Sequence, residues 1–292
     1  MKNKFSGIGV ALVTPFSKDM AIDWKGFEKL LLHTAAIGTD YWVVQGTTGE
    51  SPATSKEEKQ ALLAFAKENN PQKLPIVYGI GGNYTQEVIK NIKETDLNGI
   101  DALLSVSPYY NKPTQKGIIA HYTAIADSSP VPIILYNVPG RTMSNISANT
   151  TLELAKHSNI IGIKEASGNL TQCMEIAQKK ENDFLLISGE DLHTPAMITF
   201  GAVGVISVLA NAFQDFNLMV KKALENNFAE SSQYLFKLLE INNLMYEEAN
   251  PVGIKNALKH FGICEDFVRL PLLQASKELD EKIKLKIQEL SY

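Results

Sequence analysis

The sequence has few cysteines and no long apolar run, and both absences limit what the protein can be. Only two of its 292 residues are cysteine, Cys173 and Cys264, and no C-x-x-C pair occurs, which argues against a disulfide framework and a structural zinc site. No apolar stretch approaches the roughly 18 residues of a membrane span. The apolar run at residues 8–13 leads into T-P-F and not into a small-residue cleavage site. We therefore expect a complete cytoplasmic chain with no membrane partner.

A large excess of charge is also missing. The net charge is −4 without a basic cluster, which argues against nucleic acid as a partner. The five histidines are scattered and show no H-E-x-x-H spacing, so we expect no metal site. A hydrophobic share of 45% and a charged share of 21% are typical of a globular protein with an ample core. The composition points to a protein that acts on small molecules.

Short apolar runs alternate with longer amphipathic segments over the first 210 residues or so. The runs are almost continuously apolar, as in a parallel sheet covered on both sides, and residues 24–37, 56–68 and 87–97 show a helical period. Eight strand–helix units favour a closed (β/α)8 TIM barrel of the α/β class over an open sheet. The predicted strands are Ile8–Val13, Tyr41–Val44, Ile76–Tyr78, Ala102–Val106, Val131–Tyr136, Ile160–Ile163, Phe184–Ile187 and Val203–Ser207.

Helix caps and the C-terminal third complete the expected organisation. Asp23, Ser55 (with Glu58 at the capping-box position) and Thr85 are predicted N-terminal caps. Only helices are predicted beyond Asn211, at residues 216–226, 228–249, 251–261 and 272–290. We expect the first of them to close the barrel and the others to pack on it. The predicted units are therefore a catalytic barrel, residues 1–226, and a C-terminal helical domain, residues 227–292.

Polar residues follow the carboxyl ends of the predicted strands, where barrels of this kind carry their active sites. The motifs are G-T-T-G-E-S-P, S-P-Y-Y-N-K-P, L-Y-N-V-P-G-R-T, I-G-I-K-E and S-G-E-D, which contain Thr47, Thr48, Tyr109, Tyr110, Tyr136, Arg141, Lys164 and Gly189. Each motif alone has an ordinary explanation as a turn, a helix cap or a solvated surface. Their convergence on one rim around a single lysine favours an active site.

Lys164 is the predicted nucleophile. A free lysine, with a pKa near 10.4, is protonated at neutral pH, but burial in a barrel favours the neutral amine. Strand alternation places Lys164 and Gly162 on one face and Glu165 on the other, so Glu165 should not act as its counter-ion. A neutral amine in this position can attack a keto group and form a Schiff base.

Schiff-base chemistry also needs proton carriers and sites for carboxylates. The phenol of Tyr136 can donate and accept, and the Thr47 hydroxyl can relay a proton to Tyr110. Backbone N–H groups of the T-T-G turn suit one carboxylate, and the guanidinium of Arg141 suits a second.

These motifs, in order and spacing and over essentially the whole chain, resemble those of the dihydrodipicolinate synthase and N-acetylneuraminate lyase family of pyruvate-dependent Schiff-base lyases and aldolases. The resemblance implies a (β/α)8 barrel with a C-terminal helical domain, usually assembled as a homotetramer of tight dimers. It also implies condensation of pyruvate with L-aspartate 4-semialdehyde to 4-hydroxy-tetrahydrodipicolinate, on the route to diaminopimelate and lysine. A covalent imine takes the place of a cofactor.

The resemblance gives individual residues a role. The implied catalytic set is Lys164, which forms the imine, with Tyr136, Thr47 and Tyr110 as a proton relay in which Tyr110 reaches the neighbouring subunit's site. The implied substrate-binding set is Thr48 (with Thr47) for the pyruvate carboxylate, Arg141 for the aldehyde's carboxylate, and the carbonyls of Gly189 and Ile206. N-acetylneuraminate lyases typically have serine at the Thr48 position and no arginine at the Arg141 position, so Arg141 carries the substrate assignment.

The family also suggests an effector site. Members inhibited by lysine bind it at the dimer interface, at positions that match Ser51, Lys56, Lys59, Asn83, Glu87 and Tyr109. Lys56 and Lys59 stand where sensitive enzymes often have histidine, and two cations disfavour a cationic effector, although Glu87 offsets part of that repulsion. We therefore predict weak or absent inhibition by lysine.

Other functions remain open from the residues alone. Another pyruvate-dependent aldolase of the family, acting on N-acetylneuraminate or a 2-keto-3-deoxy sugar acid, shares the lysine chemistry. A phosphate-binding barrel isomerase is disfavoured because Glu190 and Asp191 follow the seventh strand and repel phosphate. A non-catalytic metabolite sensor is disfavoured by the intact set of polar residues.

Overall fold

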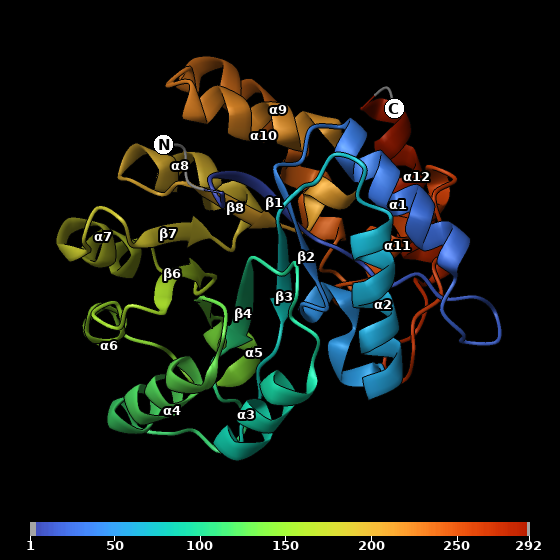
Figure 1. Cartoon of the computed structure of the whole chain (residues 1–292). Coiled ribbons are helices and arrows are strands. Elements are labelled where there is room, and N and C mark those ends of the chain that lie inside the picture. Colours follow the sequence, from blue (N-terminus) through green and yellow to red (C-terminus); the bar gives the residue numbers. More distant parts are fainter. Residues whose placement is uncertain (1–3, 291–292) are drawn as a thin grey trace.

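Eight parallel strands close into a barrel in the computed structural model of the chain, which describes residues 4–290 (Figure 1). Each strand pairs with the next along the chain, and β8 pairs with β1. The predicted TIM barrel is therefore confirmed. The strands are β1 (Gly7–Ala11), β2 (Tyr41–Val44), β3 (Ile76–Gly79), β4 (Ala102–Val106), β5 (Ile133–Asn137), β6 (Ile160–Glu165), β7 (Leu185–Ser188) and β8 (Gly204–Ser207).

Helices surround the barrel and continue beyond it (Figure 1). Around the barrel lie α1 (Trp24–Ala36), α2 (Lys56–Glu68), α3 (Thr85–Glu94), α4 (Gln115–Ser128), α5 (Pro139–Thr142), α6 (Ala148–Leu154), α7 (Leu170–Lys179), α8 (Thr194–Thr199) and α9 (Gln214–Leu224). The C-terminal helical segment comprises α10 (Phe228–Leu244), α11 (Val252–His260) and α12 (Lys277–Glu289). As predicted, α9 closes the barrel, because it contacts β1 and β8.

Several predicted boundaries were wrong by a few residues. Strand β6 continues to Glu165, so Lys164 lies inside the strand and not at its end. Helix α10 ends at Leu244, where a turn follows, and α12 begins only at Lys277, after the N-terminal cap Ser276. The outer ends of the two predicted units, residues 1–3 and 291–292, lie outside the described residues. The boundary between those units stays a prediction.

Two of the three predicted helix caps are confirmed. The Asp23 carboxylate accepts from the Gly26 N–H, and Ser55 and Glu58 form the complete capping box of α2. The third was wrong, since Thr85 is the first residue of α3 and its hydroxyl lies 2.9 Å from His121 Nδ1 on α4. The Thr85 hydroxyl thus bonds to a buried imidazole on the neighbouring helix and does not cap α3.

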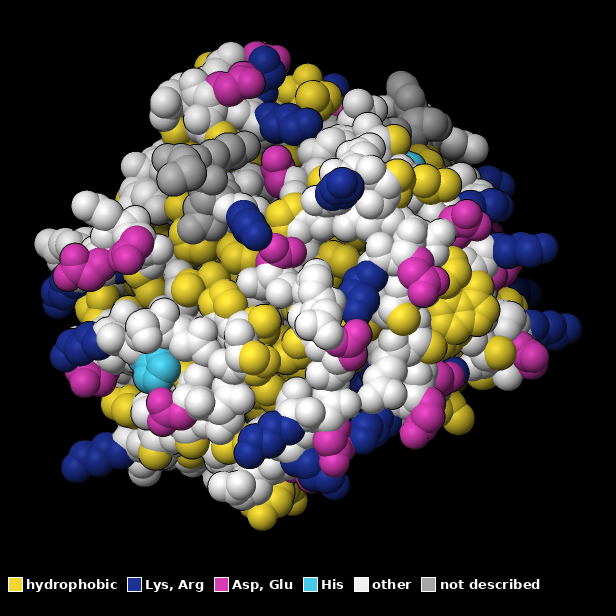
Figure 2. Space-filling model, viewed as in Figure 1, with side chains coloured by type: hydrophobic (Ala, Val, Ile, Leu, Met, Phe, Trp, Pro, Cys, Tyr) yellow, Lys and Arg dark blue, Asp and Glu magenta, His cyan; other side chains and the backbone are white. Residues whose placement is uncertain are grey.

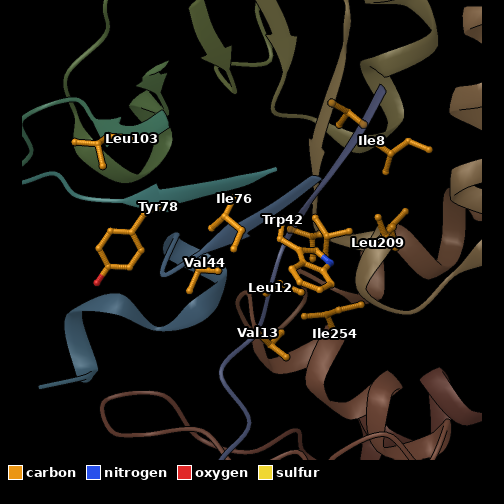
Figure 3. Packing of buried hydrophobic residues seen from close by; sticks show 14 of the residues in the cluster. Ile8, Leu12, Val13, Trp42, Val44, Ile76, Tyr78, Leu103, Leu209 and Ile254 are labelled. Atoms are coloured by element: carbon orange, nitrogen blue, oxygen red, sulfur yellow. The ribbon is translucent and has the colours of Figure 1, made fainter. Parts of the chain in front are cut away.

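The core has two layers, one inside the barrel and one between strands and helices. Inside lie apolar side chains such as Ala11, Leu104 and Ile187. The larger outer layer joins the strands to the helices, and Figure 3 shows Ile254 of α11 near Leu12 and Val13, which directly follow β1. The C-terminal helical segment is thus part of the same apolar core as the barrel.

Charges of both signs are dispersed over the surface. In Figure 2, acidic and basic side chains are interspersed around the visible face, and apolar side chains show near its middle. Across residues 4–290, no helix combines the length and the apolar character needed to cross a membrane.

Candidate active site

Lys164 and Tyr136 are neighbours on adjacent strands. The β5–β6 register pairs them directly, and both face the barrel interior, where their exposed fractions are 6% and 7%. The Lys164 ammonium lies 4.5 Å from the centre of the Tyr136 ring. This pairing brings a primary amine and a phenol together in an enclosed place.

Gly189 leaves room for the lysine side chain. A Cβ atom at this position would lie 3.0 Å from Lys164 Cε and 2.5 Å from Ala166 Cβ. The loop after β7 therefore approaches the amine so closely that a side chain does not fit without displacement. Ile206 of β8 belongs to the apolar layer inside the barrel and is 1% exposed.

Glu165 is not the counter-ion of Lys164, as predicted, but two other carboxyl groups lie near the amine. Glu165 does face away, where Asn137, Gln172 and the Ser167 N–H donate to it, and burial raises its pKa. Two other carboxyl groups are close enough for the Lys164 charge to act on them. Burial raises the pKa of Glu190, and it raises the pKa of Asp191 to about 6, while the positive charge of Lys164 opposes both shifts.

A cavity of about 360 Å³ opens beside this pair. Its wall includes Tyr136, Thr47 from the turn after β2, and Arg141 from α5. Tyr136 thus belongs both to the cavity wall and to the pair with Lys164, which is not itself part of the wall. An amine, a phenol, a hydroxyl and an exposed guanidinium gathered in this way suit a reaction between small acidic carbonyl compounds.

Thr48 is not among the residues that line this cavity, and its side chain bonds to another part of the chain. It is 3% exposed, and its hydroxyl accepts from Asn250 Nδ2 at 3.0 Å. The next residue but one, Glu50, has a left-handed backbone (φ 53°). The turn thus has one threonine on the cavity wall and one bound to the C-terminal helical segment.

Tyr110 lies outside the site within one chain. Its side chain is 87% exposed, its φ is 72°, and Tyr109 lines the cavity instead. The Tyr110 N–H donates to the carbonyl of Thr142 at 3.4 Å. The predicted relay from Thr47 to Tyr110 is therefore not assembled by this chain alone.

A second, smaller cavity of about 120 Å³ adjoins the first. Ser51 and Lys59 line both cavities, and Lys56 lines only the smaller one. Lys56 pairs with Glu94 at 2.6 Å, whereas within residues 4–290 Lys59 forms no ion pair, and burial lowers its pKa. The remaining predicted effector residues, Asn83, Glu87 and Tyr109, do not line this smaller cavity.

The sequence did not single out Tyr246 as a site residue. It follows α10, whose residues contact the Asp191–His193 turn, and it is 38% exposed as a whole. Burial of its phenol and then the negative charges of Asp191 and Glu190 raise its pKa well above the usual value. No motif in the chain marks it, because it comes from the C-terminal helices and not from a strand end.

Among residues 4–290, no three histidine, cysteine, aspartate or glutamate side chains are grouped so that they could hold a metal ion.

Comparison with known proteins places the chain among enzymes of one kind. A model of the dihydrodipicolinate synthetase family matches residues 4–290. A 4-hydroxy-tetrahydrodipicolinate synthase of Cytophaga hutchinsonii is 52% identical and is aligned over 96% of this chain and 95% of its own. The dihydrodipicolinate synthase structure from Cyanidioschyzon merolae with lysine bound has a TM-score of 0.95 at 34% identity, with 99% of each chain covered. The chloride-inhibited enzyme from Acinetobacter baumannii, complexed with pyruvate, has a TM-score of 0.94 at 35% identity and covers 98% of this chain and 99% of its own.

Proposed function

The chain belongs to the dihydrodipicolinate synthetase family, and on this premise we propose that it is a lyase that condenses pyruvate with L-aspartate 4-semialdehyde to 4-hydroxy-tetrahydrodipicolinate. The observation that carries the proposal is the enclosed Lys164 amine, 4.5 Å from the Tyr136 ring centre and beside a cavity that Thr47 and Arg141 help to line. The product is an intermediate in the synthesis of diaminopimelate and lysine.

The chemistry runs through an imine on Lys164. Its Nζ forms a bond to C2 of pyruvate, and the carbinolamine loses its oxygen as water. Loss of a C3 proton gives an enamine, which forms the new carbon–carbon bond to the aldehyde carbon, and the aldehyde oxygen takes up a proton. The amino group of the semialdehyde then replaces Lys164 at C2, which closes the ring and frees the enzyme. One water is released in total.

Tyr136 is the proposed proton carrier at the amine. Its phenol can donate to the departing carbinolamine oxygen and can accept a proton in later steps. Thr47 lines the same cavity and is the proposed next member of the relay. Tyr110, exposed in one chain, is the proposed third member, supplied by the neighbouring subunit of a homotetramer built from dimers.

The proposal includes two carboxylate sites. The turn that carries Thr47 and Thr48 is the proposed site for pyruvate's carboxylate, through backbone N–H groups. Arg141, exposed on α5 at the cavity, is the proposed partner of the semialdehyde's carboxylate. The carbonyl groups of Gly189 and Ile206 are the proposed remaining contacts. The reaction needs no resident metal or cofactor, because the lysine supplies the covalent group.

The test compares co-substrates at fixed pyruvate concentration. With L-aspartate 4-semialdehyde we expect turnover to the cyclic product, and with N-acetylmannosamine none. The variant Arg141→Ala should raise the KM for the semialdehyde about tenfold or more, since it removes a charge-assisted contact, and should leave pyruvate binding unchanged. Turnover with N-acetylmannosamine alone contradicts the proposal and identifies another aldolase of the family. No turnover with either compound is the result expected of a sensor.

A further inference from the structure

Several polar contacts converge on the turn that carries Thr47 and Thr48. We call residues 46–50 the threonine turn; it contains the 3-10 helix η1 (Thr47–Gly49) and ends at Glu50. From the C-terminal helical segment, Asn250 Nδ2 donates to Thr48 and Lys255 Nζ donates to Glu50. These contacts join residues about two hundred positions apart in the sequence, on the side of the turn away from the cavity.

The contact between Glu50 and Lys255 is an ion pair inside the protein. Lys255, on α11, has an exposed fraction of 0% and Glu50 of 4%, and Nζ lies 2.5 Å from Oε1. Lys255 also donates to the carbonyl of Phe267 at 2.7 Å, and the Arg269 N–H donates to the other Glu50 oxygen at 3.0 Å. Both carboxylate oxygens of Glu50 are therefore held by residues of the C-terminal helical segment.

A buried ion pair is a weak source of stability. Taking two charges out of water is unfavourable, and apolar residues of similar volume are often at least as stabilising. Helix α11 already contributes Ile254 to the apolar core, next to Lys255 in sequence (Figure 3). Helix α11 thus has apolar contacts of its own, and the ion pair adds a link from this helix to the turn.

The turn has a conformation that requires support. Glu50 adopts a left-handed backbone, which costs energy for a residue other than glycine and persists only where surrounding contacts enforce it. On the barrel side, Thr14 Oγ1 donates to the Gly49 carbonyl at 2.7 Å. On the other side lie the contacts of Lys255 and Asn250. Loss of the Lys255 contact removes the charged side chain that donates to Glu50 on this side and leaves its carboxylate with the Arg269 N–H.

We propose that Lys255 is a positioning residue, which fixes the threonine turn at the cavity wall through Glu50, with Asn250 as a second contact on Thr48. The inference deepens the proposed function, because it assumes that this turn binds the pyruvate carboxylate. It assigns Lys255 no contact with substrate. Its effect on catalysis passes through the position of the turn.

The test is the variant Lys255→Met, which keeps the length of the side chain and removes the charge. We expect the KM for pyruvate to rise about tenfold or more, since small displacements of positioning groups weaken productive binding strongly. The KM for the semialdehyde should stay within about twofold, because Arg141 lies on a different loop. An unchanged pyruvate KM in folded Lys255→Met overturns the proposal.

A matched control separates positioning from simple loss of stability. Asn256 is the next residue on α11, is fully buried, and donates to Asp266 and Asp280 without touching the turn. Asn256→Leu should lower the melting temperature and leave the pyruvate KM unchanged, because KM does not depend on the fraction of active enzyme. A similar rise in KM in Asn256→Leu contradicts a specific role for Lys255.

An alternative variant and a measurement on wild-type protein complete the test. If Lys255→Met does not fold, Asn250→Ala replaces it, and we expect a rise of about threefold in the pyruvate KM from the loss of one hydrogen bond; no rise overturns the proposal. Wild-type protein is first shown to form the pyruvate adduct on Lys164. Its absence there contradicts the proposed function itself, whereas an adduct with unchanged KM in the variants contradicts only the inference.

Discussion

At the scale of single residues, the site depends on how closely backbone and side chains approach Lys164. The lysine side chain has space because Gly189 has no side chain. A Cβ atom at position 189 would lie against Lys164 Cε and Ala166. Gly189→Ala should therefore displace the lysine from Tyr136 and lower kcat/KM for pyruvate about tenfold or more. Steady-state kinetics measure this effect.

The matched control is Gly140→Ala, since a Cβ atom at Gly140 meets no atom within 4 Å. It should retain wild-type kinetics. Equal activity of Gly189→Ala and wild type contradicts the close approach as a functional constraint.

Some residues of the candidate site could be predicted from the sequence, and others could not. The inward face of Lys164 was predictable from strand alternation, and Tyr136 from its place at the end of a neighbouring predicted strand. The direction of the Thr48 hydroxyl was not, because it is set by Asn250, about two hundred residues away. Asp191 and Tyr246 also approach the site through tertiary packing, which no local pattern records.

At the scale of elements, a buried histidine joins α3 to α4 and makes their packing depend on pH. His121 is 6% exposed, its Nδ1 lies 2.9 Å from the Thr85 hydroxyl, and burial lowers its pKa to about 4. The unfolded chain takes up this proton near the ordinary value of 6.5, and the folded protein only near 4. The His121 contribution to stability is thus complete above 6.5 and is lost as the pH falls to 4, by at most about 3 kcal/mol.

His121→Asn removes this titration. We expect the free energy of unfolding of wild type to fall more steeply than that of the variant between pH 6.5 and 4, as measured by denaturant unfolding. Parallel curves for the two proteins contradict the assignment.

The second cavity gives a prediction about effector control. Lys56 and Lys59 line it, and the Lys56 charge is partly compensated by Glu94. Lys59, half-buried and without an ion pair within residues 4–290, still disfavours a cationic ligand. We expect lysine to inhibit weakly or not at all, which steady-state inhibition assays measure. An inhibition constant in the low micromolar range contradicts this.

At the scale of the whole molecule, the barrel was predictable and its assembly was not. Continuously apolar runs indicate a parallel sheet buried on both faces, and eight such runs separated by helical segments favour its closure into a barrel. Helix ends were less predictable, as α10 stops at a turn and α12 starts at the cap Ser276, both inside longer amphipathic stretches. The place of Tyr110 depends on other copies of the chain, about which one sequence has no local signal.

Mixing two inactive variants tests whether Tyr110 acts across subunits. Lys164→Ala and Tyr110→Phe should each be strongly impaired alone. After dissociation and reassociation in equal amounts, half the dimers are mixed and each has one complete site, so about a quarter of wild-type activity should return. Unmixed variants at the same total concentration are the control. No recovery, with mixed dimers verified by mass, contradicts a role across the interface.

The central claim is that Lys164 forms a covalent imine with pyruvate, and trapping tests it most directly. The protein is incubated with pyruvate, reduced with borohydride, digested and analysed by mass spectrometry, with Lys164→Arg as the control. We expect the mass of a reduced pyruvate imine on the peptide that contains Lys164, and no adduct in the variant. Wild-type protein without an adduct at Lys164, or an adduct that persists in Lys164→Arg, contradicts the claim.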